Sequence, residues 1–132
     1  MKKILFTLVV LVGCLCVHAQ TTTTAQTVDI AKVLKFTNDN FDMGKIAFGK
    51  PTEFTVSIQN ISNYNISLDN VMVGCGCTTP KYTKDQVILP GATATVVLGF
   101  NGSAVGNFSK SATLFFSGNL TKAVSFHGEG VQ

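Results

Sequence analysis

The sequence contains no arginine and no tryptophan, and it has one histidine after its first 19 residues. All ten basic residues are lysine, so the guanidinium fork that commonly recognises phosphates and base edges is missing. The formal charge is +3, but Lys2 and Lys3 supply two of those charges and residues 20–132 carry only +1. Because no basic stripe remains, we predict that the chain does not bind nucleic acid.

Recognisable catalytic motifs are also missing. The seven acidic residues occupy turn-like or solvent-facing contexts with no paired spacing. No Gly-x-Ser-x-Gly elbow and no phosphate-binding glycine loop accompanies His127, the histidine that follows the leader. We therefore predict that the chain is not an enzyme and needs no cofactor.

The N-terminus has the pattern of a secretory signal helix. A short basic start, Met1-Lys2-Lys3, precedes an apolar run from Ile4 to Val17 that is shorter than the ~20 residues of a membrane span. Compact residues then lead to a predicted cleavage between Ala19 and Gln20. The pattern predicts a signal peptide over residues 1–19, and an exported, periplasmic or secreted product with no transmembrane span after processing.

Two other interpretations of the leader compete with cleavage at Ala19. The segment Leu11-Val12-Gly13-Cys14 resembles a bacterial lipobox, which would make Cys14 the lipidated first residue of an anchored protein. The apolar run continues to Val17, however, whereas lipoproteins usually turn polar directly after that cysteine. The second alternative is an uncleaved anchor, which the shortness of the run disfavours.

Removal of 19 from 132 residues leaves 113, a length that suits one domain. Residues 20–34 begin with a threonine-rich polar stretch, and we predict a flexible N-terminal segment there. Residues 28–34 could also start a strand or a short helix, since their pattern fits both. Residues 35–132 alternate apolar and polar side chains with a period of two, which predicts half-buried strands.

The clearest strand covers residues 52–59, where Phe54, Val56 and Ile58 share one face. Other strands are predicted within residues 36–46, 66–73, 94–100, 108–116 and 122–126, separated by turn signals. Phe115 falls on the polar face of its strand, and we predict that it contacts the second sheet, with an aromatic ligand platform as the alternative. About seven short strands without helical periodicity indicate an all-β, immunoglobulin-like sandwich.

Several motifs also resemble a bacterial family of domains of unknown function, DUF1573. They include Phe41-Asp42-Met43-Gly44-Lys45-Ile46, the strand from Phe54 to Asn60, and most specifically Gly74-Cys75-Gly76-Cys77-Thr78. The resemblance spans about residues 36 to 131, and Met43 replaces the usual phenylalanine. It implies an immunoglobulin-like fold related to the major sperm protein and hydin classes. It also implies a Bacteroidetes-type exported protein, and it supplies no established activity.

Cys75 and Cys77 are the cysteines that remain after processing, and three chemical states are open to them. In an extended strand their Cα atoms would lie about 6.6–6.8 Å apart, at the upper edge of the disulfide range. Gly74 and Gly76 allow the chain to curl and close a small disulfide ring, which we favour in an oxidising compartment. A free dithiol that exchanges with a partner is the second state, although the spacing is shorter than C-x-x-C.

The third state is a metal site. Two close thiolates suit copper(I), with Met43, Met72 and His127 as conceivable further donors. A closed zinc site needs four ligands and is disfavoured in a monomer. We expect Met72 to be ordinary packing and His127 to be an exposed strand residue.

The sequence therefore predicts an exported, non-enzymatic immunoglobulin-like module that binds an unknown protein or envelope component. A copper-binding or thiol-redox accessory protein that uses Cys75 and Cys77 is the alternative.

Overall fold

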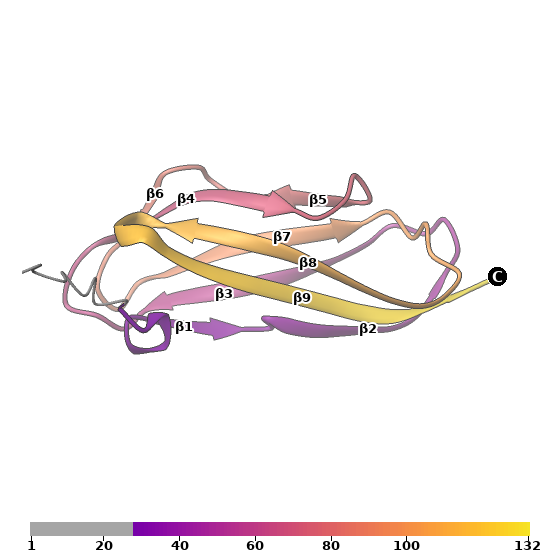
Figure 1. Cartoon of the computed structure of the whole chain (residues 1–132), viewed down its shortest axis with the longest axis horizontal. Coiled ribbons are helices and arrows are strands. Elements are labelled where there is room, and N and C mark those ends of the chain that lie inside the picture. Colours follow the sequence, from indigo (N-terminus) through magenta and orange to yellow (C-terminus); the bar gives the residue numbers. More distant parts are fainter. Residues whose placement is uncertain (1–27) are drawn as a thin grey trace, which may run out of the picture.

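The structure, a computed structural model, describes residues 28–132 of the chain. This part of the chain folds into two packed β-sheets that form an elongated sandwich (Figure 1). The predicted signal peptide, its cleavage site at Ala19 and Gln20, and the alternative lipidation site Cys14 lie outside the described residues.

One sheet has four strands in the order β1-β3-β7-β5, and the other has five in the order β2-β9-β8-β4-β6. The bounds are β1 Leu34–Thr37, β2 Asn40–Ala47, β3 Thr52–Asn60, β4 Ile66–Val73, β5 Thr78–Lys81, β6 Gln86–Ile88, β7 Thr93–Phe100, β8 Gly106–Phe116 and β9 Leu120–Val131. Two short 3-10 helices, η1 (Ile30–Lys32) and η2 (Ser117–Asn119), complete the elements. All strand pairs are antiparallel except β2 with β9.

The core lies between the two sheets and follows the predicted alternation. On β3, Phe54, Val56 and Ile58 are buried while Glu53 and Thr55 are exposed. Ala94, Val96, Leu98 and Phe100 of β7 are buried in the same way. Phe100, Phe108 and Phe126 pack against one another with ring centroids 4.7–6.5 Å apart. The all-β sandwich predicted from the sequence is thus confirmed.

The structure contains more strands than predicted: nine in the described part of the chain, against about seven. The additional strands, β5 and β6, have four and three residues, too few for a period of two to be recognised. β5 also contains Pro80, which sequence patterns count against a strand but which an edge strand tolerates. β9 is longer than predicted and continues through Gly128 and Gly130.

Residues 28–34, whose pattern fits both a strand and a short helix, contain part of each: Ile30 to Lys32 form η1, and Leu34, only 1% exposed, begins β1. One further prediction differs from the structure. Phe115 does not reach the second sheet. It lies half-buried on the outer face of β8, because its neighbours Leu114 and Phe116 both point into the core and adjacent residues of a strand face opposite ways.

The strands are staggered along their length, so several strands pair with only part of the neighbouring strand. β2 pairs with β9 from Ser125 onward, and β4 pairs with β8 only between Ala112 and Phe116. β5 likewise covers only the last part of β7, from Val97 to Phe100. The chain crosses between the sheets where β4 ends and β5 begins, and this crossing carries the cysteine motif.

Candidate functional site

The motif Gly74-Cys75-Gly76-Cys77 forms the crossing from β4 in the five-stranded sheet to β5 in the four-stranded sheet. The main chain fixes it on both sides. The amide of Gly74 donates to the carbonyl of Ser111 on β8 at 3.3 Å, and the carbonyl of Cys77 accepts from the amide of Asn101 at 3.0 Å. The motif is therefore held between the two sheets rather than projecting as a free loop.

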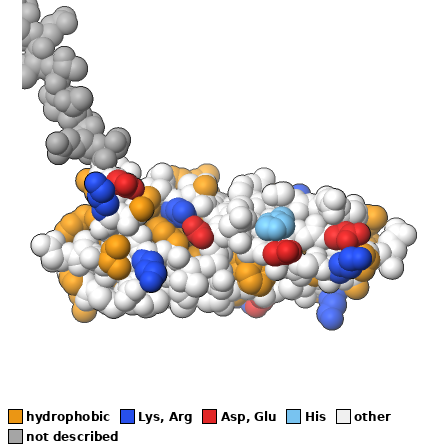
Figure 2. Space-filling view, turned by 90° about the horizontal axis from the view of Figure 1, so that it is seen from below, with side chains coloured by type: hydrophobic (Ala, Val, Ile, Leu, Met, Phe, Trp, Pro, Cys, Tyr) orange, Lys and Arg blue, Asp and Glu red, His pale blue; other side chains and the backbone are white. Residues whose placement is uncertain are grey.

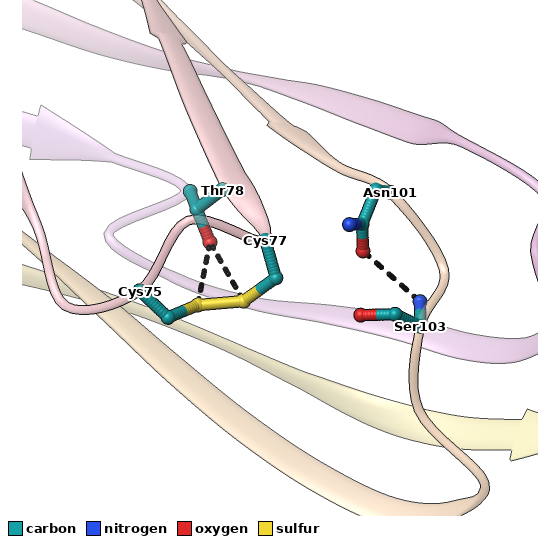
Figure 3. Close-up of a disulfide and its surroundings, with 5 residues drawn as sticks. All are labelled: Cys75, Cys77, Thr78, Asn101 and Ser103. Carbon is teal, nitrogen blue, oxygen red and sulfur yellow. Dashed lines mark hydrogen bonds between the residues drawn. A yellow bond between two sulfur atoms is a disulfide. The ribbon is translucent and has the colours of Figure 1, made fainter.

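Within this crossing the chain makes a tight turn. The amide of Thr78 donates to the carbonyl of Cys75 at 3.3 Å, which brings the Cα atoms of Cys75 and Cys77 to 5.3 Å. That separation lies within the ordinary range for disulfides, and Figure 3 shows the two sulfur atoms bonded. An extended strand would have held the two residues further apart, so the turn is what allows the pairing.

Both cysteines are half-buried and Gly76 between them is exposed. Cys77 packs against the hydrophobic core, whereas Cys75 is not among the residues that contact it. Cys77 is thus the member of the pair that contacts the core, and Cys75 lies nearer the start of the crossing.

Thr78 is the polar residue most closely associated with the sulfurs. Its side chain is almost fully buried, at 4% exposure, and its Oγ1 lies 3.8 Å from the Sγ atoms of both Cys75 and Cys77 (Figure 3). Disulfide sulfurs carry no hydrogen, so the hydroxyl is the donor, and its single hydrogen is shared between the two sulfurs. The sequence analysis missed this role, although a threonine directly after the second cysteine was visible in the motif.

Two loops, residues 48–51 and 101–105, lie next to the cysteine crossing at residues 74–77. We call these three segments together the disulfide end. The amide of Gly49 donates to the carbonyl of Gly102 at 2.9 Å, and the amide of Phe48 to the carbonyl of Val131 at 2.7 Å. A Cβ on Gly102 would lie 2.5 Å from the carbonyl oxygen of Lys50. The loops are therefore locked together by their backbones.

Two large apolar side chains remain exposed on these locked loops. Phe48 is 56% exposed and Val105 is 59% exposed. They flank the end of β9: Phe48 bonds to Val131, and the Cα of Val105 lies 3.3 Å from the position of a Cβ on Gly130. The disulfide end thus presents apolar groups from a rigid support.

The conceivable extra metal donors lie on three different strands of the five-stranded sheet. Met43 is on β2 and packs against the core. Met72 is on β4 and is 57% exposed, so the prediction that Met72 is ordinary packing is wrong. β2 and β4 are three strands apart, about 14 Å at the usual strand spacing. His127 lies on β9, two strands from β4, and residues 28–132 contain no group of three His, Cys, Asp or Glu side chains able to hold a metal.

His127 instead lines a groove of about 420 Å³ on the outer face of β2, β8 and β9. Lys45 and Glu129 form an ion pair in this groove at 3.7 Å, and Asp42 accepts a hydrogen bond from the amide of Gly44 at 2.8 Å. Figure 2 shows acidic and basic side chains next to one another on the surface that it displays, rather than a continuous basic patch. The groove is an ionic surface that carries two carboxylates and one lysine besides His127.

The opposite end of the sandwich, which we call the asparagine end, consists of residues 60–65, 89–92 and 117–119. Asn60 is fully buried there. Its side-chain amide donates to the carbonyls of Tyr64 and Ile88 at 2.7 and 2.8 Å, and its oxygen accepts from the amide and the hydroxyl of Ser62 at 2.9 and 2.7 Å. All four hydrogen-bonding capacities of this side chain are used, which makes Asn60 a structural hub.

No helix of the described residues is long and apolar enough to cross a membrane.

Comparisons with known proteins identify similar folds and a family. A search of curated proteins gives no match. Among solved structures, the chain is similar to the ASH/PapD-like domain 7 of human CEP192, with 10% identity, a TM-score of 0.59, and coverage of 76% of this chain and 87% of that one. It is also similar to a protein of unknown function from Porphyromonas gingivalis W83, with 14% identity, a TM-score of 0.61, and coverage of 74% and 46%.

A third similar structure is the YadV chaperone, with 10% identity, a TM-score of 0.54, and coverage of 76% of this chain and 53% of that one. The chain spans about half the length of the YadV and Porphyromonas chains. At these identities the likeness shows a shared PapD-like, immunoglobulin-like fold. The family model for proteins of unknown function DUF1573 matches residues 34–129, so the chain belongs to the DUF1573 family.

Proposed function

We propose that this chain is an exported, non-enzymatic immunoglobulin-like module that binds a protein or envelope component through its disulfide end. The observation that carries the proposal is the exposure of Phe48 and Val105 on backbone-locked loops. Exposed apolar groups on rigid loops are typical of interaction sites, since a rigid support loses little conformational entropy on binding.

The proposal is tested with a photo-crosslinking amino acid introduced at one position at a time in an exporting bacterial host. Leu89 provides a matched control, because it is 56% exposed, as Phe48 is, but lies at the asparagine end. We expect a discrete crosslinked product from position 48 that disappears in the Val105→Ser background. Equal crosslinking from positions 48 and 89, or none from position 48, contradicts the proposal.

The half-buried disulfide supports a second candidate function, thiol–disulfide exchange with an external thiol. An incoming thiolate attacks the Sγ of Cys75, the sulfur–sulfur bond breaks, and Cys77 leaves as a thiolate that accepts the hydrogen bond of Thr78. A second external thiol then releases the mixed disulfide. The products are an external disulfide and the protein dithiol, so two electrons pass to the protein.

Thiol titration with and without a mild reductant, combined with metal analysis, tests this candidate. Two thiols that appear and disappear reversibly support exchange, and stoichiometric copper(I) on the reduced protein supports the copper-carrier version of it. A disulfide that resists a dithiol reductant in the folded protein contradicts both.

A further inference from the structure

The staggering of the five-stranded sheet leaves half of β8 without a neighbour on one side. β4 pairs with β8 down to Ala112, and its continuation, Gly74, makes one more bond to Ser111 before the chain crosses to the other sheet. Residues 106–110 of β8 pair with β9 on their other side. Among residues 28–132, no strand lies beside this half of β8 where β4 would have continued.

The register identifies which main-chain groups point to the open side. Ser111 accepts from Gly74 on that side, and hydrogen-bonding direction alternates along a strand. Ser109 and Asn107 therefore direct their N–H and C=O groups to the same side. Neither residue has a hydrogen-bond partner there among residues 28–132, and both are exposed.

A second open stretch, residues 120–124 of β9, provides a contrast. β2 begins to pair with β9 only at Ser125, which leaves Thr121 and Ala123 open toward the β2 side. Lys122 between them is directed inward, where it pairs with Asp39 at 2.7 Å and lies 5.2 Å from the ring centroid of Phe36. An inward-pointing lysine on an edge strand is a known device against strand addition, and Lys122 already has its carboxylate partner.

The open half of β8 also carries a lysine on its inner face, Lys110, but this lysine has no ion-pair partner among residues 28–132. Lys110 has the same alternation as the buried Phe108 and Ala112, and it is half-buried. None of the ion pairs among residues 28–132 includes Lys110. An incoming strand would therefore place a side chain beside a cation that lacks a carboxylate partner.

We propose that residues 106–110 of β8 are a docking edge for an extended segment of a partner polypeptide, added antiparallel to β8 and carrying an acidic residue opposite Lys110. The inference deepens the proposed binding function, on which it rests, by naming the form of the partner. Ser109 and Asn107 each exchange two main-chain hydrogen bonds with one residue of the segment. The acidic side chain neutralises Lys110, and the residue opposite Phe108 is apolar.

The probe is the blocked peptide Glu-Thr-Val-Thr-Ala, whose residues lie in order opposite Lys110, Ser109, Phe108, Asn107 and Gly106. It is titrated into the isotope-labelled chain recovered from an exporting host, and amide shifts and hydrogen exchange are followed. We expect the amides of Asn107 and Ser109 to shift and gain protection, while those of Thr121 and Ala123 do not change. N-methylation of both peptide threonines should weaken binding at least tenfold, whereas N-methylation of the central valine, whose N–H points away from β8, should not.

Two protein variants complete the test. Ser109→Pro removes an outward N–H that has no partner in the sheet and should reduce binding at least tenfold, while its matched control Thr121→Pro should bind as the unmodified chain does. A lysine in place of the peptide glutamate should also weaken binding. The proposal is overturned by unchanged Asn107 and Ser109 amides at millimolar peptide, by equal binding of the N-methylated threonine peptide, or by occupation of the edge by a second copy or by the chain's own N-terminal segment. None of these outcomes depends on Phe48 crosslinking, so the two proposals can fail separately.

Discussion

The two ends of the sandwich are closed by different kinds of interaction. At the asparagine end one buried side chain, Asn60, makes four hydrogen bonds of 2.7–2.9 Å. At the disulfide end closure comes from the backbone, through the Gly49–Gly102 bond and the close approach of Gly102 to Lys50. The two sulfurs there receive only the hydroxyl of Thr78, at 3.8 Å.

This difference separates a stabilising role from a chemical one. A disulfide between residues two apart closes almost no chain, so it contributes little to the stability of the fold. The loops around it are already fixed by backbone contacts that do not involve sulfur. We therefore expect the disulfide end to keep its shape when Cys75 and Cys77 are reduced, which would leave the pair available for exchange.

The largest expected effect is that of Gly102→Ala. Gly102 has φ +75° and a Cβ there would meet the backbone of Lys50 at 2.5 Å, so left-handed strain and overpacking combine to destabilise the fold by about 4 kcal/mol. Gly118 at the asparagine end also has φ +75° but nothing within 4 Å, and Gly118→Ala should cost only about 1 kcal/mol. Urea denaturation measures both. Equal losses would show that the loops of the disulfide end are not closed by this backbone contact.

The second-largest effect is expected for Asn60→Ala, which should lower the free energy of unfolding by about 3 kcal/mol. The substitution removes four hydrogen bonds and leaves the carbonyl of Ile88 buried without its donor. Asn65, in the same loop, is exposed and makes no side-chain hydrogen bond, so Asn65→Ala should change the unfolding free energy by less than about 0.5 kcal/mol. A similar loss in both variants would contradict the hub role of Asn60.

Removal of the disulfide should have a smaller effect. The double variant Cys75→Ser with Cys77→Ser is expected to lose less than about 2 kcal/mol, because the bridge constrains so few residues of the unfolded chain. The urea midpoint of the unmodified protein with and without a dithiol reductant provides an independent measurement. Unfolding on reduction would mean that the disulfide end depends on its sulfurs as the asparagine end depends on Asn60.

The smallest effect on stability is expected for Thr78→Val. The hydroxyl donates only long contacts to sulfur in the oxidised protein, so the loss should stay below about 1 kcal/mol. A hydrogen bond to a departing thiolate is stronger, and reduction by a dithiol should therefore slow severalfold. Thr79→Val, at an exposed position next along β5, is the control and should keep the original rate. An unchanged rate in Thr78→Val would remove Thr78 from the exchange step.

Much of the fold could be predicted from the sequence because burial on one face of a strand imposes a period of two. The faces of β3 and β7 are as expected, and β4 begins and ends at the predicted residues Ile66 and Val73. β5 and β6 could not be predicted, since three or four residues do not establish a period. The length of β9 was also hidden, because Gly128 and Gly130 interrupt the pattern for a reason visible only in the structure. A Cβ at these positions would meet the carbonyl oxygens of Gly44 and Ala104.

The candidate site divides in the same way. The sequence by itself determined which residues are available for chemistry. These are Cys75 and Cys77 with their flanking glycines, and the sequence contains no recognisable catalytic motif beside them. Only the tertiary structure decided that their crossing is anchored to Ser111 and Asn101, and that the strands of Met43 and Met72 lie three positions apart in one sheet. It also decided that β8 is left open beside the motif, because strand stagger and sheet crossing depend on contacts between residues far apart in the chain, which local alternation does not record.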